Sequence, residues 1–243
     1  MIDTEQCGGG DKPARPCDGE QIAQVVDAAS GGADGPRGTV RIVAPEGFGT
    51  VFAAPCLVRV QAEHPGITVE LVTSTSPLSL RGSGFDIAVT VGSATSSRLT
   101  AEALAPYALR LYASRDYLAA HPPIVSLSDL ERHPLVFYVD ALLTVRELDL
   151  APVLNGMHVG FGSTNVFAQL EATRSGAGIG LLHAFMAESD PRLAPVLPDE
   201  VDFRLMFSLS VRKDSLGVEA VRVVRDALFA EVRQRADELL PVR

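Results

Sequence analysis

The sequence of 243 residues contains no tryptophan, only three cysteines and few aromatic residues. Three cysteines do not make a disulfide framework. Cys7 and Cys17 lie in a segment rich in glycine and proline, with no cluster of His or Cys beside them. Cys56 falls on the apolar face of an expected helix, where a small core residue fits. No metal site and no cofactor are therefore predicted.

The sequence also lacks long apolar runs and a secretory signal. No run approaches the roughly 18–20 apolar residues that cross a bilayer. The first residues (MIDTE) have neither the basic nor the apolar region of a signal peptide. These two absences predict a cytoplasmic protein that has no membrane partner.

Positive charge is scarce, since 21 Lys and Arg face 30 Asp and Glu, for a formal net charge of −9. Binding to nucleic acid phosphates needs clustered basic side chains. The densest basic set, Arg222, Arg225, Arg233 and Arg235, alternates with acids on an expected helix, which is typical of a solvated face. The sequence therefore argues against DNA binding by this chain alone.

Catalytic motifs are missing as well. The sequence has no Gly-x-Ser-x-Gly elbow, no Walker loop and no His-Glu-x-x-His, and its five histidines are dispersed. The glycine-rich stretch at 176–180 follows an expected helix and precedes an expected strand, the reverse of a dinucleotide-binding loop. We expect the chain not to be an enzyme.

What the sequence does contain is a strand, a turn, a helix and a second strand between residues 38 and 72. Residues 39–44 alternate in polarity, 45–49 read as a turn, and Thr50 is expected to cap a helix that runs to about Glu63. Residues 67–72 form the next strand, which predicts a parallel pair joined by a crossover. The unpaired N–H groups at the helix start would then face the carboxyl edge of the sheet, where small anions bind.

The same design returns later in the chain. Residues 157–161 read as a strand, 162–165 as turn and cap, 166–174 as a helix and 179–182 as a strand. Further strands are expected at 85–91, 108–113, 135–138 and 203–211, and a closing helix at 218–239. Two α/β lobes, each offering a helix start, predict a clamshell with the ligand between them.

The order and spacing of these segments resemble the effector-binding domain of LysR-type transcriptional regulators over residues 20–235. The stretches that carry the resemblance are 38–42 (GTVRI), 45–49 (PEGFG), 64–65 (HP), 85–89 (FDIAV) with 91–92 (VG), 114–118 (SRDYL), 129–135 (DLERHPL) and 176–182 (GAGIGLL).

The resemblance implies a fold of two Rossmann-like subdomains in a periplasmic-binding-protein-like (type 2) clamshell, joined by two crossover strands. It implies a small-molecule effector, such as a carboxylate or an aromatic metabolite, and dimers formed through this domain. In the family, a preceding winged helix-turn-helix domain reads DNA. Only 37 residues precede Gly38 here. We therefore expect the DNA-binding domain to be absent, contact with DNA to be indirect, and pairing as a homodimer or as a heterodimer with full-length relatives.

The expected organisation follows from that resemblance. Residues 1–19 are a disordered tail, and 20–37 are a remnant of the linker helix with a flexible joint. Residues 38–105 with 209–243 form effector subdomain I, and 106–208 form subdomain II.

The candidate effector-binding residues lie where the expected strands end and the helices begin. Each has a structural alternative, either as an ordinary cap or loop or as a core residue. Thr90 stands near the place where many members of the family have an arginine, and Glu46 would repel an acidic ligand unless it points away. The candidates are Glu46, Gly47, Phe48, Gly49, Thr50, Thr75, Ser76, Thr90, Val91, Phe137, Ser163, Thr164 and Asn165.

Two other function classes share the fold. A solute-binding protein of a transport system is the main alternative, but it needs export, for which no signal is visible. An enzyme of the porphobilinogen deaminase type is more remote, because no cofactor attachment pattern is present.

Overall fold

The computed structural model describes residues 35–74, 84–92, 96–139 and 157–242. The chain separates into two compact units, Met1–Gly35 and Pro36–Arg243, and the description below concerns the second. Several expectations fall outside the described residues: the tail, the linker helix, Cys7, Cys17, and the site residues Thr75 and Ser76.

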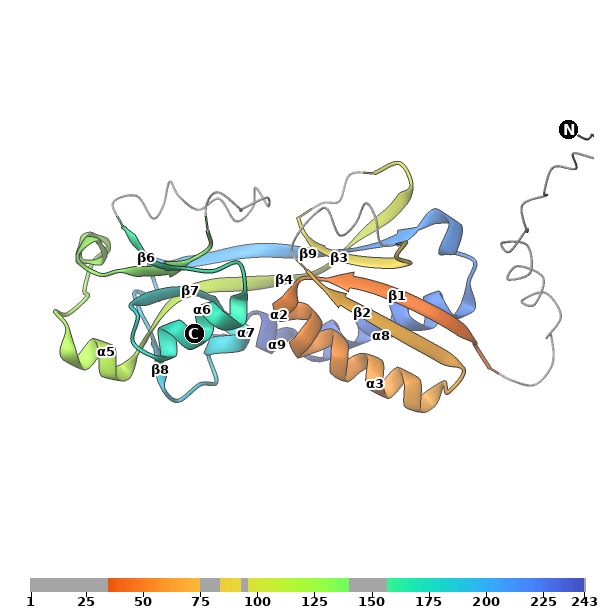
Figure 1. The fold of residues 1–243 in the computed structure, drawn as a ribbon, viewed down its shortest axis with the longest axis horizontal. Helices are drawn as coiled ribbons and strands as arrows, with labels where there is room; N and C mark the ends of the chain where they lie inside the picture. Colours follow the sequence, from red (N-terminus) through yellow and green to blue (C-terminus); the bar gives the residue numbers. More distant parts are fainter. Residues whose placement is uncertain (1–34, 75–83, 93–95, 140–156, 243) are drawn as a thin grey trace, which may run out of the picture. The chain divides into compact units, whose positions relative to one another are not determined.

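A mixed nine-stranded sheet forms the centre of this unit (Figure 1). Its strands follow the order β2-β1-β3-β9-β4-β7-β5-β6, and β8 pairs separately with β4. The strands are β1 (Gly38–Ala44), β2 (Ile67–Thr73), β3 (Ile87–Val91), β4 (Leu99–Ser114), β5 (Leu135–Phe137), β6 (Val159–Gly162), β7 (Ile179–His183), β8 (Leu193–Pro195) and β9 (Asp202–Arg212).

Parallel pairing occurs on both sides of the β4–β9 pair. On one side β1 is parallel to β2 and to β3, and on the other β5 is parallel to β6 and to β7. Val40 and Ile42 of β1 are fully buried, and so is Ala88 of β3, because helices or loops cover these inner strands. The predicted parallel strand-helix-strand units are confirmed.

The two long strands β4 and β9 are antiparallel and connect the two parallel parts of the sheet. The sequence predicts only residues 108–113 as a strand here, because Pro106 breaks the pattern. Instead β4 continues through Pro106, which pairs with Met206 just after a register shift between Ala103 and Ala105. An irregularity of this kind accommodates a proline, which cannot donate to the ladder. The predicted subdomain boundaries fall within these two strands and stay predictions.

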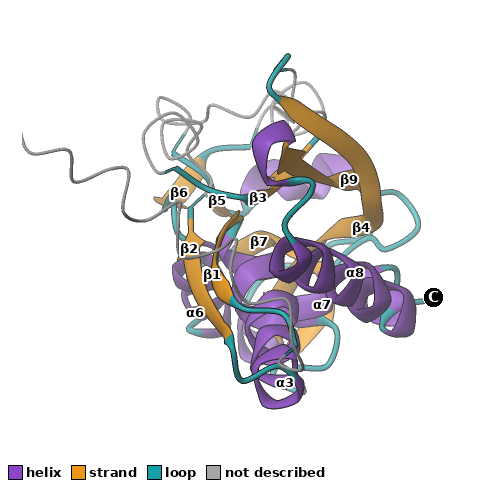
Figure 2. Ribbon diagram, turned by 90° about the vertical axis from the view of Figure 1, so that its right-hand side faces the viewer, coloured by secondary structure: helices purple, strands orange, loops and turns teal. Residues whose placement is uncertain are grey.

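Helices cover the sheet on both sides of the β4–β9 pair. In Figure 2, α3 and α8 lie together, and they contact β2 and β1 respectively. The helical elements are α2 (Glu46–Phe48), η1 (Gly49–Ala53), α3 (Ala54–Glu63), α5 (Arg115–Ala120), η2 (Leu127–Arg132), α6 (Val166–Arg174), α7 (Ala184–Ala187), η5 (Lys213–Ser215), α8 (Glu219–Gln234) and α9 (Ala236–Leu239).

The bounds of the described helices agree with the predicted bounds in some cases and differ in others. α6 has the predicted bounds, whereas the closing helix stops at Gln234 and resumes as α9 after Arg235. The short elements α7 and β8 were not predicted. None of the helices in the described ranges is long and apolar enough to span a membrane.

An aromatic cluster at the centre of the core fixes the first helix on the sheet. The ring of Phe207 (β9) lies 5.0 Å from that of Phe48 and 4.0 Å from that of Tyr107 (β4). Phe48 also stacks on Phe52 at 5.7 Å, and all four side chains are fully buried. Burying one such ring stabilises the fold by about 1.5–3 kcal/mol. Phe48, in the first turn of the helix after β1, is thus held against β9 and, through the Phe207 ring, against β4.

Candidate functional site

The helix after β1 begins at Glu46 and not at Thr50. Helical backbone runs without a break from α2 through η1, a π-helical turn, into α3. Pro45 is the N-cap and makes no side-chain capping hydrogen bond. Thr50 lies inside the helix with its side chain exposed, so the predictions that residues 45–49 form a turn and that Thr50 is the cap are wrong.

The two glycines that suggest a turn are needed for close packing inside this helix. A Cβ at Gly49 would lie 2.6 Å from Cγ2 of Thr73 at the end of β2. A Cβ at Gly47 would lie 3.2 Å from Sδ of Met186. A side chain at Gly49 would clash with Thr73, and one at Gly47 would crowd the end of Met186. Close packing therefore favours glycine at both positions without any left-handed backbone.

The start of α2 contacts the starts of two helices from the other side of the β4–β9 pair (Figure 1). Besides Met186, the atoms closest to a Cβ at Gly47 are Cζ of Phe185, at 3.4 Å, and Cγ2 of Val166, at 3.6 Å. Val166 is the first residue of α6, and Phe185 and Met186 belong to α7. The convergence of helix starts that the sequence predicts is therefore present, with α7 as an additional member.

Glu46 is half-buried at this convergence. Its Oε2 atom is buried and has no hydrogen-bond partner among the described residues. Tyr138, which follows β5, lies close enough to interact electrostatically with this carboxylate. Burial, and then the charge of Glu46, raises the pKa of the Tyr138 hydroxyl well above its usual range. A buried carboxyl oxygen without a partner among the described residues is unexpected in a site predicted to take an anion.

The start of α6 is capped by its own chain. Asn165 Oδ1 accepts the N–H of Ala168 at 2.9 Å, and Ser163 Oγ accepts the N–H of Asn165 at 3.1 Å. The side-chain amide of Gln169 donates to the carbonyl of Ser163 at 2.7 Å. Thr164 is exposed. The predicted capping chemistry is confirmed, and it occupies side-chain acceptors of both Ser163 and Asn165.

The ends of β3 and β5 contribute less polar surface than the sequence suggests. Thr90 and Val91 are half-buried, and the Thr90 hydroxyl is 3.5 Å from the carbonyl of Gly92. Phe137 is almost fully buried and packs edge-on against Tyr138. Like Phe48, Phe137 belongs to the hydrophobic core, so these two side chains contribute packing to the site.

Sequence reasoning missed three apolar side chains at the convergence. Val166, Phe185 and Met186 contact α2 because α6 and α7 both begin there. The apolar residues from Ile179 to Leu182 predict a strand, but nothing after them marks where α7 begins. These contacts depend on pairing between strands that are distant in the sequence.

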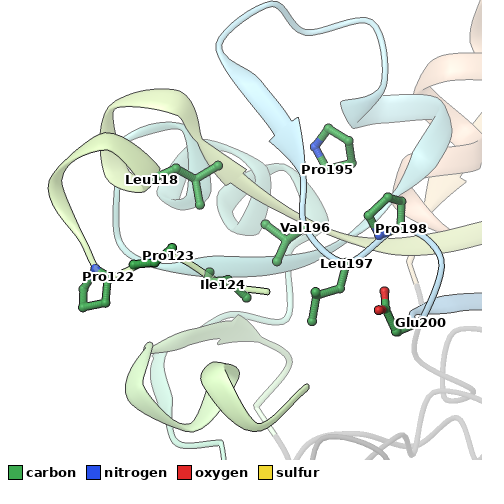
Figure 3. Close-up of a pocket in the computed structure, with 9 residues that line it drawn as sticks. All are labelled: Leu118, Pro122, Pro123, Ile124, Pro195, Val196, Leu197, Pro198 and Glu200. Atoms are coloured by element: carbon green, nitrogen blue, oxygen red, sulfur yellow. The ribbon is translucent and has the colours of Figure 1, made fainter. Parts of the chain in front are cut away.

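A separate pocket lies in the part of the unit that contains α5 and β8 (Figure 3). It has a volume of about 470 Å³, and one of its apolar walls, Leu197, has left-handed backbone with φ of 46°. No predicted site residue lines it. Its lining residues are Leu118, Pro122, Pro123, Ile124, Pro195, Val196, Leu197, Pro198 and Glu200.

Two titratable groups elsewhere in the described residues, Cys56 and His183, are buried in the fold. Cys56 is buried, as predicted, and burial raises the pKa of its thiol to about 11. His183, the N-cap of α7, is stacked 5.4 Å from Tyr107, and burial lowers its pKa to about 4. Within the described ranges, no three His, Cys, Asp or Glu side chains are placed to hold a metal ion.

Comparison with known proteins gives the family. The LysR substrate binding domain matches residues 33–233 of this chain. The chain therefore belongs to the LysR substrate-binding domain family, and its fold is the periplasmic-binding-protein-like α/β fold of that family.

Among curated proteins, the chain is similar to the transcriptional regulator CrgA of Neisseria meningitidis, with 27% identity over 205 residues. That match covers 81% of this chain and 68% of CrgA. It is also 27% identical over 115 residues to DmlR of Escherichia coli, covering 47% of this chain and 38% of DmlR. A Haemophilus influenzae regulator, which this chain matches at 28% identity, is likewise covered over only 37% of its length.

Solved structures agree with this assignment. The regulatory domain of CrgA superposes with a TM-score of 0.71 at 25% identity, covering 81% of this chain and 99% of that domain. The effector domain of AmpR from Pseudomonas aeruginosa gives a TM-score of 0.67 at 21% identity, over 84% of this chain and all of that domain. At that identity the likeness to AmpR shows the fold alone.

Proposed function

We propose that this chain senses a small-molecule effector and controls transcription as the effector-binding part of a LysR-type regulator. One observation carries the proposal: the start of α2 meets the starts of α6 and α7 across the β4–β9 pair. A ligand held between these starts would contact both parts of the sheet at once. Its binding energy can then shift the two parts relative to each other, which is what a sensor requires.

The proposed contacts come from both parts of the sheet. Backbone N–H groups at the start of α2 lack intrahelical partners and can bind an acceptor. Phe48 and Phe137 act only as packed support. The remaining contacts proposed from the sequence are Glu46, Gly47, Gly49, Thr50, Thr75, Ser76, Thr90, Val91, Ser163, Thr164 and Asn165.

The proposal includes the setting of the protein. The chain acts in the cytoplasm without an enzymatic activity, and dimerises with itself or with full-length relatives. A separate domain reads DNA. The names of its relatives as transcriptional regulators support this setting over transport.

The direct test is a thermal-shift screen of the full chain against small carboxylates, amino acids and aromatic metabolites. A compound that binds the folded state raises Tm. Thr164→Trp places a bulky side chain at the exposed start of α6 and is expected to abolish the ligand-induced rise in Tm. Ser128→Trp, at an exposed position in η2, is expected to leave that rise unchanged. Failure of every compound to stabilise the chain would contradict a sensing role.

Two further measurements separate the alternatives. Turnover of a stabilising compound, followed by mass spectrometry, would point to an enzyme. Recovery of the protein from a periplasmic fraction would point to a transport solute-binding protein. A gel-shift assay with the isolated chain is expected to show no specific binding to duplex DNA at physiological salt.

A further inference from the structure

The side chain of Glu46 bears on which effector fits the site, and this inference rests on the proposed function. Oε2 of Glu46 is buried without a hydrogen-bond partner among the described residues. Such an oxygen has lost its water without gaining a donor in exchange, and leaving it unpaired is unfavourable. Native folds pair nearly all buried polar groups, so an exception at a convergence of helix starts indicates a missing partner.

The described residues do not supply a cation for this carboxylate. Arg235, for example, is engaged elsewhere: it donates to Glu238 at 2.7 Å and lies over the Phe52 ring at 4.2 Å. At the end of β3 the chain has Thr90, whose hydroxyl carries no charge. Gly47, the residue after Glu46, lies against apolar side chains at the start of α7, and the buried Tyr138 is close enough to interact with the Glu46 charge.

We infer that the effector presents a hydrogen-bond donor, an ammonium or hydroxyl group, to Oε2 of Glu46. The unpaired N–H groups at the start of α2 take an acceptor of the same ligand. The fitting class is therefore a small molecule with a donor beside an acceptor, such as an amino acid or a hydroxy acid. A carboxylate that has no donor leaves Glu46 unpaired and adds repulsion.

The premise is tested without any ligand. Glu46→Gln removes the charge with little change of shape, and it is expected to raise Tm at pH 7 by about 2–4 °C. The rise would occur although the helix dipole favours an acid in the first turn. Glu219→Gln is the matched control, because Glu219 is also in a first turn, that of α8, but is exposed. An unchanged or lowered Tm for Glu46→Gln alone would overturn the inference.

The ligand class is tested with matched probes at pH 7: phenylalanine against 3-phenylpropanoate, and lactate or alanine against propanoate. Wild type is expected to be stabilised more by the member that carries the donor. Glu46→Gln is expected to weaken binding of that member by about 10- to 100-fold. Equal or stronger stabilisation by the donor-free acids would overturn the inference while leaving the sensing role intact. If no probe or screened compound binds but Glu46→Gln still raises Tm, the sensing role fails and the unpaired state of Glu46 stands.

Discussion

The starts of α2 and α6 follow parallel strands in the two parts of the sheet, yet they differ in how their polar groups are hydrogen-bonded. The start of α6 is closed by its own chain, since Asn165 caps it and Ser163 is bonded on both sides. The start of α2 has Pro45 as an N-cap without a side-chain bond, and the buried Oε2 of Glu46 lacks a partner among the described residues.

The difference separates a structural helix start from one with unused bonding capacity. Where every group is paired, as in α6, a ligand must compete with existing bonds. At α2 a ligand would supply bonds that the described residues do not make. We therefore expect loss of the capping side chains Ser163 and Asn165 to act mainly on stability, and substitutions at α2 to act on packing or ligand binding.

The largest expected effect concerns α7, the third helix start at the convergence. Its N-cap His183 is buried neutral with a pKa of about 4, below the value of about 6.5 in the unfolded chain. The unfolded state therefore binds more protons between these values, and stability falls as the pH is lowered through this window. From pH 7 to pH 4, His183 is expected to remove about 3 kcal/mol of unfolding free energy.

Urea unfolding of wild type and His183→Phe at both pH values measures this effect. The variant lacks the titrating group, so its stability is expected to fall less on acidification. Parallel pH profiles for the two proteins would show that His183 is not buried neutral.

A second substitution breaks the contact between the two parts of the sheet. Gly47→Val places methyl groups where Sδ of Met186 already lies within 3.2 Å of a Cβ position. Overpacking of this kind is expected to destabilise the chain by about 1–3 kcal/mol in denaturant unfolding.

Two controls accompany it. Met186→Ala in the same chain is expected to restore part of the loss, because it removes the nearest obstacle. Gly217→Val, at a position with no heavy atom within 4 Å of a Cβ, is expected to change stability by less than about 0.5 kcal/mol. Equal losses at both glycines would mean that Gly47 does not contact α7.

A smaller effect is expected for the cap of α6. Asn165→Ala removes the acceptor of the Ala168 N–H and is expected to cost about 1 kcal/mol of unfolding free energy. Thr164→Ala, one residue earlier and exposed, serves as the control and is expected to be nearly neutral. A neutral Asn165→Ala variant would show that α6 does not depend on this cap.

The smallest effect is expected at Thr50. If it capped the helix, as its sequence context suggests, alanine would cost about 1 kcal/mol. Because Thr50 is exposed inside the helix, Thr50→Ala is expected to change stability by no more than about 0.5 kcal/mol. Thermal unfolding of the variant distinguishes the two positions of the helix start.

These cases show what the sequence could predict. α6 was predicted with its bounds because both of its signals are local: the Asn165 cap, and the stop at Ser175 and Gly176. The start of α2 was predicted wrongly because Gly47 and Gly49 satisfy packing against Met186 and Thr73, which lie elsewhere in the chain.

The candidate site was predictable as a place but not as a set of contacts. Parallel pairing puts strand ends at one edge, which located Glu46 and Asn165 near one another in the fold. Burial of Glu46 Oε2, and the apolar wall of Phe185 and Met186, follow from the pairing of β7 with β4 and β5. No local pattern in the sequence carries that information.

The β4–β9 pair has a consequence for how the protein is made. Arg110 and Asp202, paired in this ribbon, are 92 positions apart in the sequence. Strand β3 likewise gains β9 as its second neighbour only after β9 has been synthesised. During synthesis, therefore, both interior edges of the sheet stay open until the ribosome has passed Arg212, and a chain stalled before that point would expose them to aggregation.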